Sequence, residues 1–278
     1  MNVRLGISRR SIALLAGLLG MVSLAIGAHA ALNKRSLDAA KAIGTEQAGE
    51  AATGPARLAL VIGNGHYPDA SAPLAQPIND ARALTATLRR NGFDVDVVED
   101  ASKDDMERAV ARLKSRVSKD AVVMLFFGGY GVQAGRESYM VPVDARIWKE
   151  SDVKREGISV ESVLSEIKET GARAKLVVLD ASRRNPYERR FRSFSHGLAP
   201  ISAPDNALIL TSATPGKVAD DSKGNNSVLV SELLAHLNSQ AGLESVFNKT
   251  RVSISRASDG AQVPTVSSTL VEDLSLGG

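Results

Sequence analysis

Three short stretches of the chain hold side chains that could do chemistry: "GNGHY" at 63–67, "GGYGVQ" at 128–133 and "DASRRNP" at 180–186. Ser182 directly follows an apolar run, as a serine nucleophile does, but its neighbours are D-A-S-R-R and not G-x-S-x-G. A serine hydroxyl also needs a general base within hydrogen-bond reach. His66 and His196 are the candidates, and His66 is the better one because it lies three residues beyond a predicted strand.

Other classes of site lack the residues that they need. Neither glycine-rich stretch completes a G-x-G-x-x-G pattern or a P-loop, so these glycines are predicted to be turn residues rather than nucleotide ligands. His66, His196 and His236 stand far apart, without the spacing of paired metal ligands. The chain has no cysteine, which excludes a thiolate nucleophile and a cysteine-bound metal. We therefore expect no metal and no cofactor.

The elements that must position these stretches alternate between apolar strands and amphipathic helices. The residues predicted to be strands are 56–64, 93–100, 120–129, 174–181, 206–213 and the last extended piece, 261–268. Helices are predicted after a cap at Asn79 or Asp80, after a capping box of Ser102 with Asp105, and near 159–170, 228–238 and 242–256. A small hairpin is predicted over 132–145, around Gly135.

Almost wholly apolar strands that alternate with helices predict an α/β fold, with a mainly parallel six-stranded sheet and helices on both faces. Ligands of such sheets bind beyond the carboxyl ends of the strands. The three stretches follow predicted strands, so we expect all of them at one edge of the sheet.

The first 55 residues are predicted to precede this domain. Residues 1–30 combine a basic start, an apolar run and "AHA" before Ala31, as in an export signal. A retained tether or a buried core helix is the alternative. Residues 31–55 are predicted to be a flexible linker, which leaves 56–278 as the domain. We expect a periplasmic or secreted bacterial protein that uses Sec or, since "SRRSIAL" suits it, twin-arginine export.

The charge of the chain argues against two kinds of partner. Without Arg4, Arg9 and Arg10 of the predicted signal, Lys and Arg fall from 34 to 31, which equals the 31 Asp and Glu. A neutral remainder predicts no binding to nucleic acid and, after signal removal, no binding to membranes.

Several segments in order resemble bacterial caspase-like peptidases, the metacaspase and orthocaspase relatives within the caspase–haemoglobinase fold. They span about 57–270 and include "RLALVIGNGHY", "PINDARAL", "LRRNGFDV", "VMLFFGGYGVQ", "YMVPVDA", "LVVLDASRRNP", "GLAP" and "TSATPG". The resemblance implies a cysteine endopeptidase with a histidine in S-G-H-G after the third strand and a cysteine in D-x-C after the fourth. Tyr130 stands at the histidine position and Ser182 at the cysteine position.

Both substitutions predict a loss of catalysis. A tyrosine hydroxyl ionises near pH 10, at about three units above neutrality, and so is not a base at pH 7. A Tyr130–Ser182 pair could share a hydrogen bond but could not run this acyl transfer. The resemblance also implies that Gly131 donates an oxyanion-hole N–H, and that Asp80 and Asp180 belong to a pocket selecting Arg or Lys. Their alternatives are a helix cap for Asp80 and, for Asp180, a strand-end acid bonded to backbone amides.

The loop at 182–197 holds five arginines, which either form a solvated loop or supply a basic residue to the acidic pocket in cis: Arg183, Arg184, Arg189, Arg190 and Arg192. Three functions follow. The first is an inactive pseudo-peptidase that binds a peptide or protein partner. In one version of this hypothesis, the site recognises an Arg or Lys side chain of the partner. The second is an active endopeptidase with Ser182 as nucleophile and His66 or His196 as base. The third is a purely structural or assembly domain.

Overall fold

The computed structural model describes residues 55–68, 73–191, 197–219, 224–237 and 241–276. The chain from Pro55 onward makes up one compact unit. The predicted export signal, all but the last residue of the predicted linker, Arg192 and His196 lie outside the described residues.

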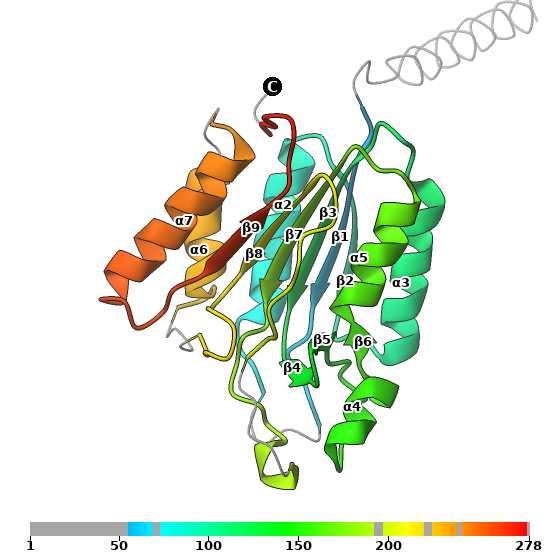
Figure 1. Ribbon diagram of the computed structural model, residues 1–278, viewed down its shortest axis with the longest axis vertical. Helices are drawn as coiled ribbons and strands as arrows, with labels where there is room; N and C mark the ends of the chain where they lie inside the picture. The colour runs from blue at the N-terminus through cyan, green and yellow to red at the C-terminus, as the bar shows by residue number, and fades with distance from the viewer. Residues whose placement is uncertain (1–54, 69–72, 192–196, 220–223, 238–240, 277–278) are drawn as a thin grey trace, which may run out of the picture. The chain divides into compact units, whose positions relative to one another are not determined.

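The main sheet has six strands in the order β2-β1-β3-β7-β8-β9 (Figure 1). Its strands are β1 (Arg57–Gly63), β2 (Asp94–Glu99), β3 (Val122–Gly128), β7 (Ala174–Asp180), β8 (Ala207–Thr211) and β9 (Thr265–Ser268). The first five run parallel, and β9 pairs with β8 in the antiparallel sense. Every residue of β3, β7 and β8 is buried, which is why these strands are mainly apolar, with Lys175, Asp180 and Thr211 as the polar residues of β7 and β8. The predicted fold class is confirmed.

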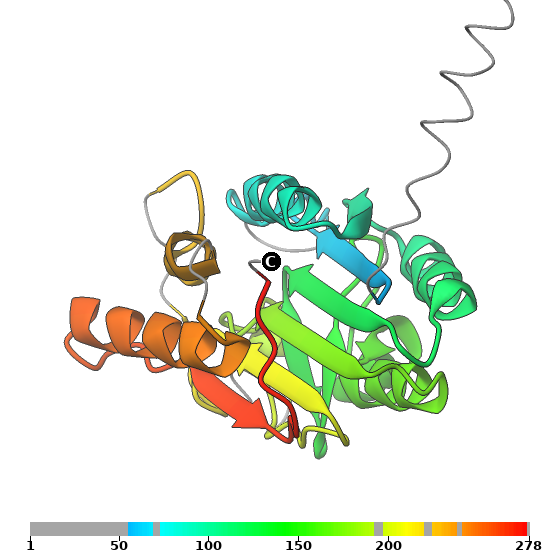
Figure 2. The same ribbon diagram turned by 90° about the horizontal axis from the view of Figure 1, so that it is seen from above.

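Helices cover both faces of this sheet (Figure 2). One face packs against α2 (Pro77–Arg90), α6 (Val228–Leu237) and α7 (Leu243–Ala257). The other packs against α3 (Lys103–Arg116) and α5 (Val160–Glu169). Each helix turns one apolar stripe inward, as Leu84 and Leu88 do in α2. Among the described residues, no helix has the length and apolar character needed to cross a membrane.

The starts of two helices test the cap predictions. Ser102 and Asp105 form the predicted capping box, with each side chain bonded to the other residue's backbone N–H at 3.2 Å. The prediction for α2 is wrong, because that helix begins at Pro77 with Gln76 as its N-cap. A proline is favoured at the first helical position, since it lacks an N–H that would have no partner there. Asp80 therefore lies in the first turn of α2 and is not its N-cap.

A second, smaller sheet lies beside the carboxyl ends of the main strands. It consists of the predicted hairpin, β4 (Gly131–Ala134) and β5 (Glu137–Met140), and of β6 (Ile158–Ser159). Gly135 makes the hairpin turn with a φ of 70°, a value that glycine adopts without strain. The short helices α4 (Glu150–Glu156) and η1 (Glu188–Arg190) were not predicted, because neither is long enough to show a helical apolar period.

The strand register aligns the last residues of three strands. Gly63 of β1 pairs with Gly128 of β3, and Gly128 pairs with Asp180 of β7. A Cβ on Gly63 would lie 2.5 Å from the carbonyl oxygen of Pro77, so no larger residue fits there without displacing α2. The glycine lets the first turn of α2 rest on the end of β1. Asp80 is thereby brought to the edge of the sheet that carries Asp180.

Candidate functional site

The three stretches with candidate chemistry do meet at one edge of the sheet. The chain passes from β1 to β2 on one side and to β3 on the other, so this edge is the switch point where ligands of such sheets bind. Backbone hydrogen bonds join the stretches: Asn64 N to Gly128 O at 2.8 Å, Gly129 N to Asp180 O at 3.2 Å and Gly131 N to Ala181 O at 3.0 Å.

Ser182 and Tyr130 are both buried, with 1% and 7% of their surfaces exposed. The hydroxyl of Ser182 makes no hydrogen bond with any described residue. The hydrogen bond that Tyr130 and Ser182 could have shared is therefore not formed. Tyr130 packs edge-to-face on Tyr67, with ring centroids 4.8 Å apart, and donates its backbone N–H to the Tyr67 hydroxyl. Burial raises the pKa of Tyr67, so this hydroxyl stays neutral and donates to Val141 O. Among the described residues, none is thus placed to act as a base for Ser182.

The Gly131 N–H, which is expected in an oxyanion hole, and the N–H of Ser182 are both engaged within the protein. The Gly131 N–H donates to the Ala181 carbonyl at 3.0 Å, and the Ser182 N–H donates to the Ser212 hydroxyl at 3.2 Å. A Cβ on Gly131 would lie 2.5 Å from Leu198, so the glycine is needed for close packing in this conformation. The predicted role of Gly131 would require it to release Ala181 first.

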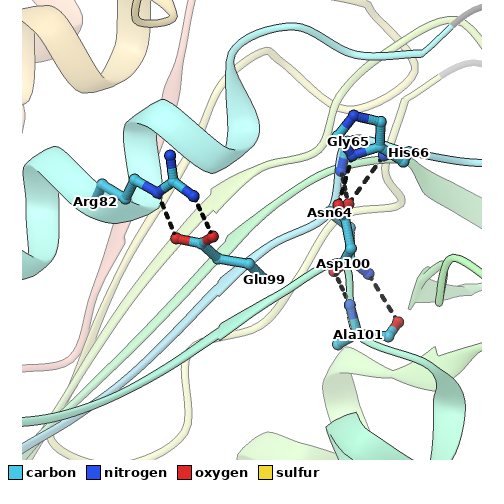
Figure 3. Close-up of polar contacts among 7 residues, drawn as sticks. All are labelled: Asn64, Gly65, His66, Arg82, Glu99, Asp100 and Ala101. Atoms are coloured by element: carbon cyan, nitrogen blue, oxygen red, sulfur yellow. Dashed lines mark hydrogen bonds and ion pairs between the residues drawn. The ribbon is translucent and has the colours of Figure 1, made fainter.

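His66 pairs with Asp100 (Figure 3). A relocated catalytic base would instead have to pair with Ser182. Nδ1 of His66 lies 2.5 Å from Oδ2 of Asp100, and Oδ1 of Asp100 accepts the N–H groups of Gly65 and His66 at 2.9 Å. Burial acts to raise the pKa of Asp100, but these backbone and imidazole donors outweigh it and lower the pKa. The imidazole is 73% exposed, whereas the Ser182 hydroxyl is buried without a partner among the described residues. The structure does not join His66 to Ser182.

Two polar contacts that sequence reasoning missed hold the loops of this edge. Asn64 is fully buried and bridges two segments. Its Oδ1 accepts Ala101 N at 2.8 Å (Figure 3), and its Nδ2 donates to Val141 O at 3.3 Å. Arg82 of α2 makes a forked pair with Glu99 at the end of β2, with distances of 2.7 and 2.6 Å. An asparagine directly after a buried strand was the only sequence signal for the first contact.

The two acids predicted to form a pocket are both buried at this edge. Oδ1 of Asp80 accepts Asn226 Nδ2 at 2.8 Å and Ser227 N at 2.9 Å, while Oδ2 has no hydrogen-bond partner among the residues that the structure describes. Asp180 lies against the guanidinium of Arg183. Burial and the negative charge of Asp180 together raise the pKa of Asp80 from 3.8 to about 6. The two carboxylates therefore act on each other electrostatically, as members of one site would.

Buried side-chain atoms that make no hydrogen bond with any described residue include Asp80 Oδ2 and Thr85 Oγ1 of α2, and the Ser182 hydroxyl and Asn185 Nδ2 of the segment that follows β7. Each such atom costs about 1–3 kcal/mol unless solvent or a ligand satisfies it. A separate groove of about 840 Å³ between α3 and α5 shares none of these residues, and we give it no part in the site.

Asp80 should make the stability of the protein depend on pH. In the folded protein the pKa of Asp80 is about 6, above its ordinary value of 3.8. The stability that Asp80 contributes is therefore fully present below pH 3.8 and is lost as the pH rises through 6. Between pH 4 and pH 8, we expect the unfolding free energy of the wild type to fall by up to about 3 kcal/mol relative to that of Asp80→Asn. Urea unfolding across this range checks it. The exposed Asp120→Asn is the control, and parallel curves for wild type and Asp80→Asn would contradict the assignment.

The comparisons with known proteins agree with this fold. The family model described as "Caspase domain" matches residues 56–275. The human mucosa-associated lymphoid tissue lymphoma translocation protein 1 is 30% identical over 133 residues, and its mouse homolog is 31% identical over 133 residues. These alignments cover 48% of this chain but only 16% of each relative, so the chain spans a small part of the curated proteins it matches. Since the family model covers most of the chain, the protein belongs to the caspase domain family and is related to cysteine peptidases.

Proposed function

We propose that this is an exported, catalytically inactive caspase-domain protein of the metacaspase or orthocaspase type. It binds a peptide or protein partner at a basic side chain without cutting it. The observation that carries this proposal is the pair of buried, mutually interacting carboxylates, Asp80 and Asp180, near a Ser182 hydroxyl that has no base among the described residues.

The chemistry of the Ser182 region supports inactivity. The chain has no cysteine, and the hydroxyl of Ser182 is buried without a described partner that could take its proton. The N–H groups of Gly131 and Ser182 are used inside the protein, so they do not present a preorganised hole for a developing oxyanion. An enzyme of this kind would need at least the base and one of these donors.

The acidic pair supports retained binding. Two buried carboxylates are costly unless a cation lies with them. The free Oδ2 of Asp80 can accept from an incoming donor, and a guanidinium meets two carboxylates with its forked N–H groups better than an ammonium does. A purely structural domain has no comparable reason to keep an unsatisfied buried carboxylate oxygen.

Export is tested by the start of the mature chain. The basic start, the apolar run and "AHA" predict cleavage before Ala31 and a location outside the cytoplasm. N-terminal sequencing of the protein from fractionated bacterial cells checks this. The double change Arg9→Lys/Arg10→Lys should block export only if the twin-arginine route is used. An intact Met1 in the cytoplasmic fraction would contradict the proposal.

Inactivity is tested by hydrolysis of a fluorogenic peptide library with Arg or Lys before the reporter group, with and without calcium. We expect no turnover above the rate without protein, and no difference between the wild type and Ser182→Ala. Clear wild-type turnover that Ser182→Ala abolishes, and that His66→Ala also reduces, would instead establish the serine endopeptidase.

Binding is tested by calorimetry with two peptides that differ only in one residue, arginine or norleucine. We expect the arginine peptide to bind more tightly, and Asp80→Asn to weaken it by about 1–3 kcal/mol, the range for a lost hydrogen bond to a charged group. Asp120→Asn serves as control. Because the pKa of Asp80 is about 6, affinity should fall as the pH is lowered from 8 to 5. Equal affinity for the two peptides would contradict the proposed pocket.

A further inference from the structure

A cation of the protein's own chain already lies at the acidic pair. The guanidinium of Arg183 faces the carboxylate of Asp180, with Nη1–Oδ1 and Nη2–Oδ2 distances of 3.4 and 3.5 Å. Both side chains are buried, with 5% and 2% exposed. Arg183 comes from the turn that follows β7, three residues beyond its partner acid, so the contact forms within one short segment of the chain. It is the position at which the proposed partner would place its basic side chain.

The contact is loose and leaves the acidic pair incompletely neutralised. Hydrogen bonds between a guanidinium and a carboxylate are normally about 2.7–2.9 Å long, well below the 3.4 and 3.5 Å seen here. The ion pair of Arg183 is with Asp180, and Oδ2 of Asp80 has no hydrogen-bond partner in the described part of the chain. A better placed cation could therefore form hydrogen bonds that Arg183 does not make.

The surroundings of Arg183 give its side chain another place to go. Arg183 also lines a cavity of about 600 Å³, together with Arg184, residues 218–219 and residues of the turn at 258–262. The far end of the same loop is held: Arg190 donates to Ile147 O at 2.6 Å, and its guanidinium stacks on Trp148 at 4.6 Å. Phe191 is buried beside the small sheet. Because the far end of the loop is held, the side chain of Arg183 can move while the rest of the loop stays in place.

We propose that Arg183 is an internal competitor for the acidic pair. On the basis of the proposed function, its guanidinium occupies the carboxylate of Asp180 when no partner is bound and turns into the neighbouring cavity when a partner's arginine enters. The partner must then displace Arg183, so the protein binds basic side chains more weakly than the acidic pair alone would. Such a device restricts binding to partners with additional contacts beyond the one arginine.

The test uses the purified protein and the same arginine and norleucine peptides, measured by calorimetry. Arg183→Gln should bind the arginine peptide about tenfold or more tightly than the wild type, because the population of the open pocket rises. Arg189→Gln is the matched control. It removes the same charge from the same loop, at an exposed side chain that does not line the cavity. Arg189→Gln should leave the affinity close to that of the wild type.

The outcomes separate this inference from the function on which it rests. Equal tightening by Arg183→Gln and Arg189→Gln would mean a general charge effect and would overturn the competitor. Equal affinities of wild type and Arg183→Gln for the arginine peptide, above those for norleucine, would also overturn it but leave the acidic pocket intact. Equal affinities of all proteins for the two peptides would overturn the pocket itself, and the competitor with it.

Arg183→Gln leaves two buried carboxylates without their cation and could fail to fold. The double variant Asp80→Asn/Arg183→Gln removes one of these charges, and its reference is then Asp80→Asn alone. Tighter binding of the arginine peptide by the double variant than by Asp80→Asn supports the competitor, and unchanged binding contradicts it.

Discussion

The register of three parallel strands, together with the close approach of a helix to their ends, is the constraint on which the site depends. Gly63, Gly128 and Asp180 are neighbours across β1, β3 and β7. Because Gly63 has no side chain, the carbonyl of Pro77 can pack against the end of β1. Asp80, three residues further along α2, is thereby buried near Asp180. A side chain at Gly63 would push away the element that supplies half of the acidic pair.

The same constraint explains why the acidic pair needs a cation. A helix that rests on strand ends excludes water, and in its absence two carboxylates repel each other and lose hydration. The protein meets part of this cost locally: Asn226 and Ser227 donate to Asp80, and Arg183 faces Asp180. The remainder shows as the raised pKa of Asp80 and as its unpaired oxygen.

The small sheet closes the other side of the site and fixes the positions that catalysis would use. Tyr67, Tyr130 and Tyr187 belong to its buried cluster, and Tyr130 joins Tyr67 through both its ring and its backbone. The loop ends are tied by backbone bonds from Gly129 to Asp180 and from Gly131 to Ala181. These contacts favour a closed, well-packed arrangement, in which Gly131 and Ser182 use their donors internally.

The sequence by itself determined the order and type of most elements. Buried parallel strands and amphipathic helices are patterns of single segments, so β1, β3, β7, β8 and the long helices could be predicted from apolar runs and period. The meeting of the three loop stretches also followed, because parallel strands present their carboxyl ends at one edge. Short elements such as α4 and η1 carry too few residues for such a pattern, and the start of α2 was decided by Pro77 rather than by a polar cap.

The tertiary structure alone decided how the site residues are partnered. Nothing local to Asp80 indicates that Asn226 and Ser227, about 146 residues away, donate to it, or that one of its oxygens stays unmet. His66 stood near the site in sequence terms, yet it binds Asp100 because that carboxylate collects three donors from the end of β1. The sequence showed a loop that is rich in arginine, but only the packed structure shows that Arg183 is the arginine that contacts Asp180. Hydrogen bonds between distant segments depend on positions within a few tenths of an ångström, which only the packed chain defines.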